Sequence, residues 1–325
     1  MVAVTRSKKL EKGSKIWIDG KVLDWDEGRV HVLTHALHYG TGVFEGIRCY
    51  KTEDGPAIFR LYDHASRLIN SAKIYLMDLR YSVDEIAEAI KMTVKANHLD
   101  ECYIRPIAFC GYGEMGLNPL LNKVSLAIAA WPWGTYLGEQ ALKTGVRCMV
   151  SSWRRISPST LPPQSKCTAN YANSALAKIE AIKAGYDEAI LLNVDGMVSE
   201  ATGENIFRVK RGVLSTPPAS ASILQGITRD SVIQLANDAG LTCHVAEISR
   251  EELYTSDELF LCGTAAEITP IREVDGRRIR DGQFPVTRKL QAAYGDVVRG
   301  RNSNYSHWLE YIRQTRPENV IARND

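Results

Sequence analysis

Short stretches in which hydrophobic and polar residues alternate fill the first third of the chain and predict strands joined by turns. Residues 15–19 and 21–25 flank Asp19-Gly20, a dipeptide that tolerates the positive φ angles of a tight hairpin. The same pattern predicts further strands at 44–50, 56–59, 102–111 and 124–131. The chain therefore begins with strands and hairpins.

Helices are expected where a period of three to four residues replaces this alternation. One is predicted over residues 63–77, and another begins at Ser82. Ser82 and Glu85 have the spacing of a capping box, in which each residue satisfies a backbone N–H group of the other. The apolar positions of that second helix are Ile86, Ala89, Ile90 and Val94.

The pattern is broken at Trp131-Pro132-Trp133-Gly134, where a proline and a glycine indicate a linker. Beyond it strands and helices interleave. Strands are predicted at 145–153, 187–194, 197–200, 204–209, 213–215, 241–248 and 258–262. Helices are predicted at 169–184 and 228–239, and at 250–254 with Ser249 as N-cap.

The order of these elements predicts an α/β (α+β) protein with two domains. Residues 1–130 would form a small N-terminal α/β domain, 131–140 an interdomain linker, and 141–325 a large C-terminal domain. Functional sites in such proteins usually lie in the cleft between the lobes.

Composition narrows the class of function. Of the 325 residues, 45% are hydrophobic and 24% charged, as in soluble globular proteins. The net charge of +2, with no basic stripe between aromatic residues, argues against nucleic acid and anionic membranes as partners. The longest apolar run, near 124–131, is too short to span a bilayer. The seven cysteines are scattered without a C-x-x-C pair, which favours neither disulfides nor zinc, and a cytoplasmic location is expected.

Candidate chemistry lies in four segments of the second half. Lys166 follows a stretch too rich in proline for a helix interior and precedes a predicted helix. Glu200 ends a hairpin strand. Residues 225–230 offer a glycine turn into a helix capped by Thr228, which suits an anion, and 261–266 repeat that design after a strand. Each feature alone is more often an ordinary solvated side chain or capped turn. Together they are what pyridoxal phosphate requires: a lysine, an acid for the pyridine nitrogen and a phosphate cradle.

Two further features have simpler explanations. His31, His35 and His38 have the spacing of one helical face, but no acidic ligand separates them and glycines follow. Structural or pocket-edge roles are favoured over metal binding, and no metal is expected. Cys167 is interpreted as a small buried residue rather than a redox switch.

Taken together, the segments resemble the branched-chain amino-acid aminotransferases, which belong to the class IV pyridoxal-phosphate-dependent aminotransferases and have fold type IV, the fold of D-amino-acid aminotransferase. The resemblance keeps its order and spacing from about residue 16 to 272. The matching segments are 38–48, 103–106, 116–119, 132–138, 166–171, 199–205, 226–230 and 263–270. One departure is Cys167-Thr168-Ala169-Asn170, where bacterial members usually have small residues, often glycines. It concerns local shape and substrate range rather than the lysine.

The resemblance implies a role for each cofactor-binding residue. Lys166 would be the catalytic residue, holding the cofactor covalently and, once released, moving a proton between substrate and cofactor. Glu200 would pair with the pyridine nitrogen, Tyr171 would donate to the phenolic oxygen, and Arg67 would meet the phosphate. The remaining implied cofactor-binding residues are Gly203, Leu224, Gly226, Ile227, Thr228, Gly263 and Thr264.

The resemblance also implies a substrate site. The turn Gly263-Thr264-Ala265 would bind the α-carboxylate through backbone N–H groups, supported by Tyr103, and Arg105 with Tyr39 and Tyr136 would receive the distal carboxylate of glutamate. Phe44, Gly46, Trp133, Tyr136 and Tyr171 would line an apolar side-chain pocket. Tyr39, Met115 and Leu117 would come from the neighbouring subunit, which makes a homodimer the minimum assembly. Because one pocket must accept both an aliphatic chain and a carboxylate, polar groups are expected at the edge of an apolar wall.

The implied reaction is transfer of the amino group between leucine, isoleucine or valine and 2-oxoglutarate. A D-amino-acid aminotransferase, an (R)-amine transaminase and an aminodeoxychorismate lyase share the cofactor and remain alternatives. The run 44–48 and the pair Tyr103 and Arg105 favour the branched-chain interpretation. A non-catalytic role is disfavoured because no motif position is lost.

Overall fold

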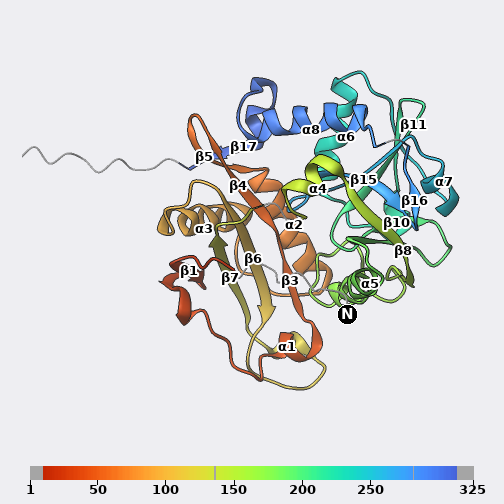
Figure 1. The fold of residues 1–325 in the computed structure, drawn as a ribbon. Helices are drawn as coiled ribbons and strands as arrows, with labels where there is room; N and C mark the ends of the chain where they lie inside the picture. The colour runs from red at the N-terminus through yellow and green to blue at the C-terminus, as the bar shows by residue number, and fades with distance from the viewer. Residues whose placement is uncertain (1–9, 135–136, 281, 313–325) are drawn as a thin grey trace, which may run out of the picture.

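The computed structural model describes residues 10–134, 137–280 and 282–312, which form two mixed layers of sheet and helix (Figure 1). In the first sheet the strand order is β17-β5-β4-β6-β7-β1-β2, and β3 pairs with β6. Its strands are β1 (Lys15–Ile18), β2 (Lys21–Asp24), β3 (Gly42–Phe44), β4 (Ile47–Thr52), β5 (Gly55–Phe59), β6 (Cys102–Cys110), β7 (Val124–Trp131) and β17 (Leu309–Tyr311). Its helices are α1 (His35–Tyr39), α2 (Leu61–Ile74) and α3 (Val83–Ala96).

Local sequence explains the turns and caps of this layer. Ile18 pairs with Lys21, and Asp19 and Gly20 have φ angles of 45° and 90°, so the predicted hairpin is confirmed. The Ser82 hydroxyl accepts the Glu85 amide at 3.3 Å, and the Glu85 carboxylate accepts the Ser82 amide at 2.7 Å, which confirms the capping box.

Helices α2 and α3 cover the first sheet and build its core. Leu68 of α2 and Ile90 of α3 pack with Ile104 and Ile128 of the central strands, all fully buried. Each such side chain contributes about 1.5–3 kcal/mol through the hydrophobic effect. This core fixes the sheet against α2, the helix that carries Arg67.

The predicted strand 44–50 is wrong as a continuous element. It divides into β3, where Phe44 pairs with Ile107, and β4, where Ile47 pairs with Ile104. The division turns the Glu45 carboxylate inward toward Arg67 and His64. Alternation alone does not reveal such a break, because the buried contacts of Glu45 come from a distant helix.

The second sheet has the strand order β10-β9-β8-β15-β14-β11-β12-β13, with β16 beside β15. Its strands are β8 (Val146–Arg154), β9 (Glu188–Leu192), β10 (Val198–Ala201), β11 (Asn205–Lys210), β12 (Val213–Thr216), β13 (Cys243–Val245), β14 (Glu258–Gly263), β15 (Glu267–Val274) and β16 (Arg277–Arg278). Its helices are α4 (Glu139–Thr144), α5 (Asn170–Lys183), α6 (Ile227–Asp238), α7 (Arg250–Tyr254) and α8 (Pro285–Val298). The structure confirms Ser249 as the N-cap of α7, where it also forms a capping box with Glu252.

Several elements of the second half differ from the prediction. The strand expected over 241–248 is shorter, because only β13 pairs, in parallel, with β12. The hydrophobic pattern did not identify β15, α8 and β17. A proline, Pro270, lies within β15 opposite Phe260 of β14, next to the point where β8 begins to pair at Ile271. Proline has no backbone N–H group to donate to a neighbouring strand. At residue 270 this costs no hydrogen bond to β8, because the pairing with β8 begins only at Ile271.

The two layers contact each other at several places along the chain. Strand β17 returns to the first sheet and pairs with β5, with Leu309 opposite Phe59. Phe59 packs edge-to-face on Tyr294 of α8. Val43 of β3 forms an isolated bridge to Cys167, just before α5. Figure 1 shows strands β1 to β7, red to yellow, beside the green-to-blue second half, with the blue strand β17 next to β5. Within the described residues no helix is long and apolar enough to cross a membrane.

Candidate active site

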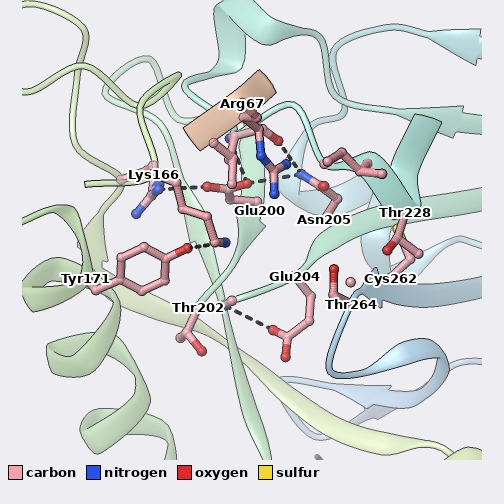
Figure 2. A pocket seen from close by; sticks show the side chains of 16 residues that line it. Arg67, Lys166, Tyr171, Glu200, Thr202, Glu204, Asn205, Thr228, Cys262 and Thr264 are labelled. Carbon is pink, nitrogen blue, oxygen red and sulfur yellow. Dashed lines mark hydrogen bonds and ion pairs between the residues drawn. The ribbon is translucent and has the colours of Figure 1, made fainter. Parts of the chain in front are cut away.

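Lys166 lies where the first sheet meets the start of α5. Its backbone N–H donates to the Ser71 hydroxyl of α2 at 3.0 Å, and its carbonyl accepts the Phe44 amide of β3 at 3.0 Å. The side-chain Nζ reaches the Tyr171 hydroxyl in the first turn of α5 at 2.8 Å. Both backbone groups are thus fixed by the first layer, and the amino group points into the pocket (Figure 2).

Glu200 is buried on β10, and polar groups surround its carboxylate. Arg155 approaches Oε1 at 2.9 Å, while Oε2 accepts the Asn205 side chain at 3.1 Å and the Leu224 amide at 3.0 Å. Burial raises the pKa of Glu200 above its ordinary value, although Arg155 opposes this rise. The three donors fix the direction of the carboxylate.

On α2 the ion pair is reversed: the arginine, Arg67, lines the pocket, and the carboxylate of Glu45 lies behind it. Its guanidinium binds Glu45 in a fork, with Nε at 2.6 Å and Nη2 at 2.8 Å, and Nη1 donates to the Gln225 carbonyl at 3.0 Å. His64 also contacts the Glu45 carboxylate, at 2.7 Å. Burial alone raises the pKa of Glu45, but Arg67 and His64 outweigh it and hold that pKa well below its usual range.

The start of α6 supplies an anion site. The first amide bonded within the helix is that of Asp230, to Gly226, so the amides of Ile227 and Thr228 have no partner inside it. The expectation that Thr228 caps this helix is wrong, because Gly226 is the N-cap and Thr228 lies in the first turn. A Cβ at Gly226 would lie 2.0 Å from the Asn205 side-chain oxygen, so only glycine allows this close approach.

One pocket contains all the residues that the resemblance implied for cofactor binding (Figure 2). Its lining is Arg67, Arg155, Lys166, Tyr171, Glu200, Thr202, Gly203, Glu204, Asn205, Leu224, Gly226, Ile227, Thr228, Cys262, Gly263 and Thr264. Sequence reasoning gave no role to Arg155, Thr202, Glu204, Asn205 and Cys262. Asn205 and Glu204 stood in a motif that was recognised, but Arg155 follows β8 without any local signal.

An aromatic wall adjoins this pocket. The Phe44 ring lies 4.8 Å from the Tyr171 ring, and Lys166 Nζ is 5.3 Å from the centre of the Phe44 ring. Arg105 lies 4.8 Å over Phe44 and donates to the Tyr103 hydroxyl at 3.2 Å. The buried Nε of Arg105 has no partner in the described part of the chain.

The same wall extends to Trp133, whose ring lies 5.1 Å from that of Tyr103. A Cβ at Gly46 would lie 1.9 Å from the Tyr103 hydroxyl, so this glycine makes room for the tyrosine. The structure therefore brings Phe44, Gly46, Tyr103, Arg105 and Trp133 together near Lys166.

Tyr39, Met115 and Leu117, which were expected to come from the neighbouring subunit, do not line the Lys166 pocket of their own chain. Tyr39 is 40% exposed and donates to the Met115 carbonyl at 3.0 Å, and Leu117 is 81% exposed. The lining of the Lys166 pocket includes Thr264 but not Ala265, Tyr39, Met115 or Leu117. Tyr136 lies outside the described residues.

The histidines and Cys167 have local partners. His35 contacts the Thr41 hydroxyl at 2.8 Å and the Gly116 carbonyl at 2.9 Å, and His38 contacts the Val32 carbonyl at 2.9 Å. Cys167 is fully buried, with its thiol 3.3 Å from the Gly40 carbonyl. These contacts hold the α1–β3 segment in place.

The donor set of the pocket fits pyridoxal phosphate. The free amides of α6 and the Arg67 guanidinium suit a phosphate, the Glu200 carboxylate suits a protonated ring nitrogen, and Lys166 with Tyr171 suits the aldehyde and phenolic oxygen between them. The contact of Gly226 with Asn205, which a Cβ would prevent, keeps the carboxylate side and the anion side close together.

Comparison with known proteins gives a consistent picture. Residues 42–274 match the family described as amino-transferase class IV. The chain is 46% identical over 306 residues to the branched-chain-amino-acid aminotransferase of Escherichia coli K12, a match that covers 94% of this chain and 99% of the relative. A crystal structure of the Escherichia coli enzyme has a TM-score of 0.91 at 46% identity and covers 93% of this chain and 100% of that one.

A second solved structure carries the cofactor. The branched-chain amino acid aminotransferase from Thermobaculum terrenum, solved in its PLP form (holo form), has a TM-score of 0.88 at 38% identity. The match covers 94% of this chain and 100% of that chain.

Proposed function

This chain belongs to the class IV aminotransferases, and from that membership we propose that it moves amino groups between branched-chain L-amino acids and 2-oxoglutarate. It is a branched-chain amino-acid aminotransferase with pyridoxal 5′-phosphate as cofactor. The products of the forward direction are the branched-chain 2-oxo acids and L-glutamate. The observation that carries the proposal is the Lys166 amino group, 2.8 Å from the Tyr171 hydroxyl, in one pocket with Glu200 and the start of α6.

Lys166 is the group that attaches the cofactor and later moves a proton. When bound, pyridoxal phosphate supplies a ring that accepts the electrons released as the substrate Cα loses its proton. Lys166 Nζ, once free, would take that proton and deliver it to the cofactor carbon C4′, on the other side of the substrate nitrogen. Its backbone bonds to Ser71 and Phe44 fix the main chain from which the side chain extends, and the Tyr171 hydroxyl orients the amino group.

Glu200 and Tyr171 set the protonation of the ring. We propose that the Glu200 carboxylate accepts a hydrogen bond from the ring nitrogen and keeps it protonated. Arg155, Asn205 and the Leu224 amide hold that carboxylate in one orientation. Tyr171 donates to the phenolic oxygen and keeps the Lys166 amine close by.

The phosphate is proposed to lie between Arg67 and the first turn of α6. The amides of Ile227, Thr228 and Thr264 donate to it, with a contribution from the positive end of the helix dipole. Gly203, Leu224 and Gly263 shape the walls on either side of the ring.

The substrate site uses the aromatic wall and Arg105. We propose that Phe44, Trp133 and Tyr103 contact the branched side chain, while Arg105 receives the distal carboxylate of glutamate or 2-oxoglutarate. Gly46 gives Tyr103 its place, and the turn Thr264-Ala265 binds the α-carboxylate. Tyr136 is proposed for the same wall.

A homodimer is proposed as the active assembly. An apolar groove of about 920 Å³ lies beside α1, and Leu37, Tyr39 and Tyr112 in its lining are 62%, 40% and 62% exposed. A second subunit covering it would bring Tyr39, Met115 and Leu117 to the neighbour's substrate site. We also propose a cytoplasmic location, and two domains divided at 131–140.

Two measurements test this function. Borohydride reduction of the holoenzyme followed by peptide mapping must place pyridoxyl on the peptide containing Lys166, and a label on another lysine contradicts the assignment. Leucine, isoleucine and valine must each give a 2-oxo acid with 2-oxoglutarate as acceptor. Turnover of D-amino acids or (R)-amines alone, or pyruvate release from aminodeoxychorismate, favours an alternative.

A further inference from the structure

Three buried carboxyl groups of the second sheet lie close enough together for their charges to interact. Glu188 is on β9, Glu200 on β10 and Glu204 directly before β11, and these residues are 0%, 5% and 5% exposed. Glu200 and Glu204 line the pocket. A buried carboxylate is costly unless a cation or several hydrogen-bond donors compensate its charge.

Cations reach two of the three. Lys178 of α5 approaches Glu188 at 2.6 Å, and Glu188 also accepts the Thr202 hydroxyl at 2.6 Å and the Ala189 amide at 2.8 Å. Arg155 pairs with Glu200. In the described ranges no ion pair reaches Glu204, whose carboxyl accepts only the Gly203 amide, at 3.1 Å (Figure 2).

The groups around Glu204 do not replace the missing cation. Glu188 and Glu200 repel its charge, and Lys178, which attracts it, is already bound to Glu188. The thiols Cys148 of β8 and Cys262 of β14 face it, and burial raises the pKa of both, so they stay uncharged. Burial, followed by the charge of Glu188, raises the pKa of Glu204 to about 8.

We propose that Glu204 serves the cofactor pocket as a neutral carboxylic acid, and that its ionisation weakens the hold of the pocket on the phosphate-bearing ligand. This inference rests on the proposed function, which places pyridoxal phosphate in that pocket. With Glu204 neutral, the charges of this wall are balanced, Lys178 against Glu188 and Arg155 against Glu200. An ionised Glu204 adds an unbalanced negative charge to the pocket in which the anionic ligand is proposed to bind.

The direction of the pH effect follows from linkage. The bound anion disfavours the ionised form, so the pKa of Glu204 is higher with the ligand than without it. Affinity is therefore full while Glu204 is protonated in the free enzyme and falls as the pH rises above that pKa. One proton limits the fall to about tenfold per pH unit.

The test compares wild type with Glu204→Gln, which keeps the shape of the neutral acid and cannot ionise. Holoenzyme is converted with excess glutamate to the pyridoxamine phosphate form, which Lys166 does not hold covalently. Its dissociation constant is then measured from about pH 7 to about pH 9. The wild-type constant is expected to rise more than that of the variant, by up to about tenfold. Glu251→Gln, an exposed position at the start of α7, is the matched control and must follow wild type.

Because both proteins share Lys166, the thiols and the phosphate, only the difference between their pH profiles reports on Glu204. Equal profiles overturn the proposal. Infrared spectra give a second readout: wild-type holoenzyme must show a protonated carboxyl band at neutral pH that is lost on alkalinisation and absent from Glu204→Gln. Absence of that band in wild type also overturns it, even if the variant does not fold. Failure of the proposed function is distinct, since borohydride would then leave no pyridoxyl on Lys166.

Discussion

The two sides of the pocket use the same kind of ion pair in opposite ways. On the side of the first sheet, Glu45 is buried behind Arg67, and the guanidinium is the member that lines the pocket. On the side of the second sheet, Arg155 braces Glu200, whose carboxylate is the group proposed to contact the ring nitrogen. One pair presents a cation to an anionic ligand and the other presents an anion to a cationic atom.

The charges around each carboxylate fit the group that its pair presents to the pocket. Glu45 has two basic partners, Arg67 and His64, and its pKa is held below its usual range, so it stays a carboxylate. Glu200 has one guanidinium and two neutral donors, and burial raises its pKa. A carboxylate with a raised pKa is the stronger hydrogen-bond acceptor for a protonated nitrogen. In the proposed function the first pair therefore anchors the phosphate, and the second controls the protonation of the ring nitrogen.

The largest expected effect comes from Glu200→Gln. An amide cannot keep the ring nitrogen protonated, so the half-reaction with leucine should slow by roughly 10²–10⁴-fold, the range for a group that controls proton transfer. The cofactor should stay bound, because Arg67 and α6 are unchanged. Stopped-flow absorbance of the half-reaction measures the loss. A near-normal rate would mean that Glu200 is structural and that the two pairs do not differ in role.

Glu45→Gln tests the anchoring pair. Breaking a buried pair leaves an uncompensated Arg67, so the free energy of unfolding should fall by about 3–5 kcal/mol. Denaturant unfolding measures it, with Asp78→Asn in the exposed Arg80–Asp78 pair as control, where about 0–1 kcal/mol is expected. Because its folded pKa is depressed, Glu45 contributes stability above about pH 4.3, and the contribution is lost as the pH falls further. Glu45→Gln should lack that acid loss.

Arg67→Lys sharpens the comparison. Lysine keeps a positive charge beside Glu45. Its single ammonium group cannot replace both hydrogen bonds to the Glu45 carboxylate and also contact the phosphate. Loss of one charge-assisted hydrogen bond, about 1.5–3 kcal/mol, should weaken cofactor affinity by roughly 10- to 150-fold. Equilibrium dialysis against pyridoxamine phosphate measures the change, while stability stays near wild type. An unchanged affinity would remove Arg67 from the phosphate site.

Arg105→Met gives the narrowest effect, because it should touch one substrate only. Among the described residues Arg105 has no carboxylate partner, unlike Arg67 and Arg155. We expect the apparent requirement for glutamate and 2-oxoglutarate to rise by roughly 10- to 150-fold while leucine changes little. Separate half-reactions with leucine and glutamate decide the matter. Equal losses would show that Arg105 only supports β6.

Local chemistry explains how much of the fold the sequence predicted. Asp19-Gly20, the Ser82–Glu85 box and the Ser249 cap depend on residues within a few positions, and all three appear as predicted. The break at Glu45, the short β13 and the strand β15 were not foreseen. The contacts of Glu45 with α2, the pairing of β13 with β12 and the pairing of β15 with β8 all lie outside a local sequence window, so no local pattern encodes them.

The candidate site divides in the same way. The residues proposed for the cofactor stood in recognisable motifs, and the structure gathers them in one pocket. Arg155 was missed because a single arginine after a strand is not a recognisable sequence motif. Its importance is visible only in the structure, where its guanidinium lies 2.9 Å from the Glu200 carboxylate. Glu204 was quoted within a motif, yet its lack of a cation becomes visible only once Lys178 and Arg155 are seen to serve other carboxylates.

Strand β17 has a consequence for how the chain folds during synthesis. It pairs with β5 although Leu309 and Phe59 are about 250 residues apart, a contact of very high sequence separation. While the ribosome makes the intervening chain, the outer edge of β5 has no strand beside it and is open to pairing with other nascent chains. Most strands of the first sheet are therefore synthesised early, but its edge strand β17 is added last. Until then, the exposed edge of β5 is a site where a chaperone can prevent aggregation. Deleting residues 309–311 should cause the protein to aggregate, although the deletion removes no residue proposed to contact the substrate.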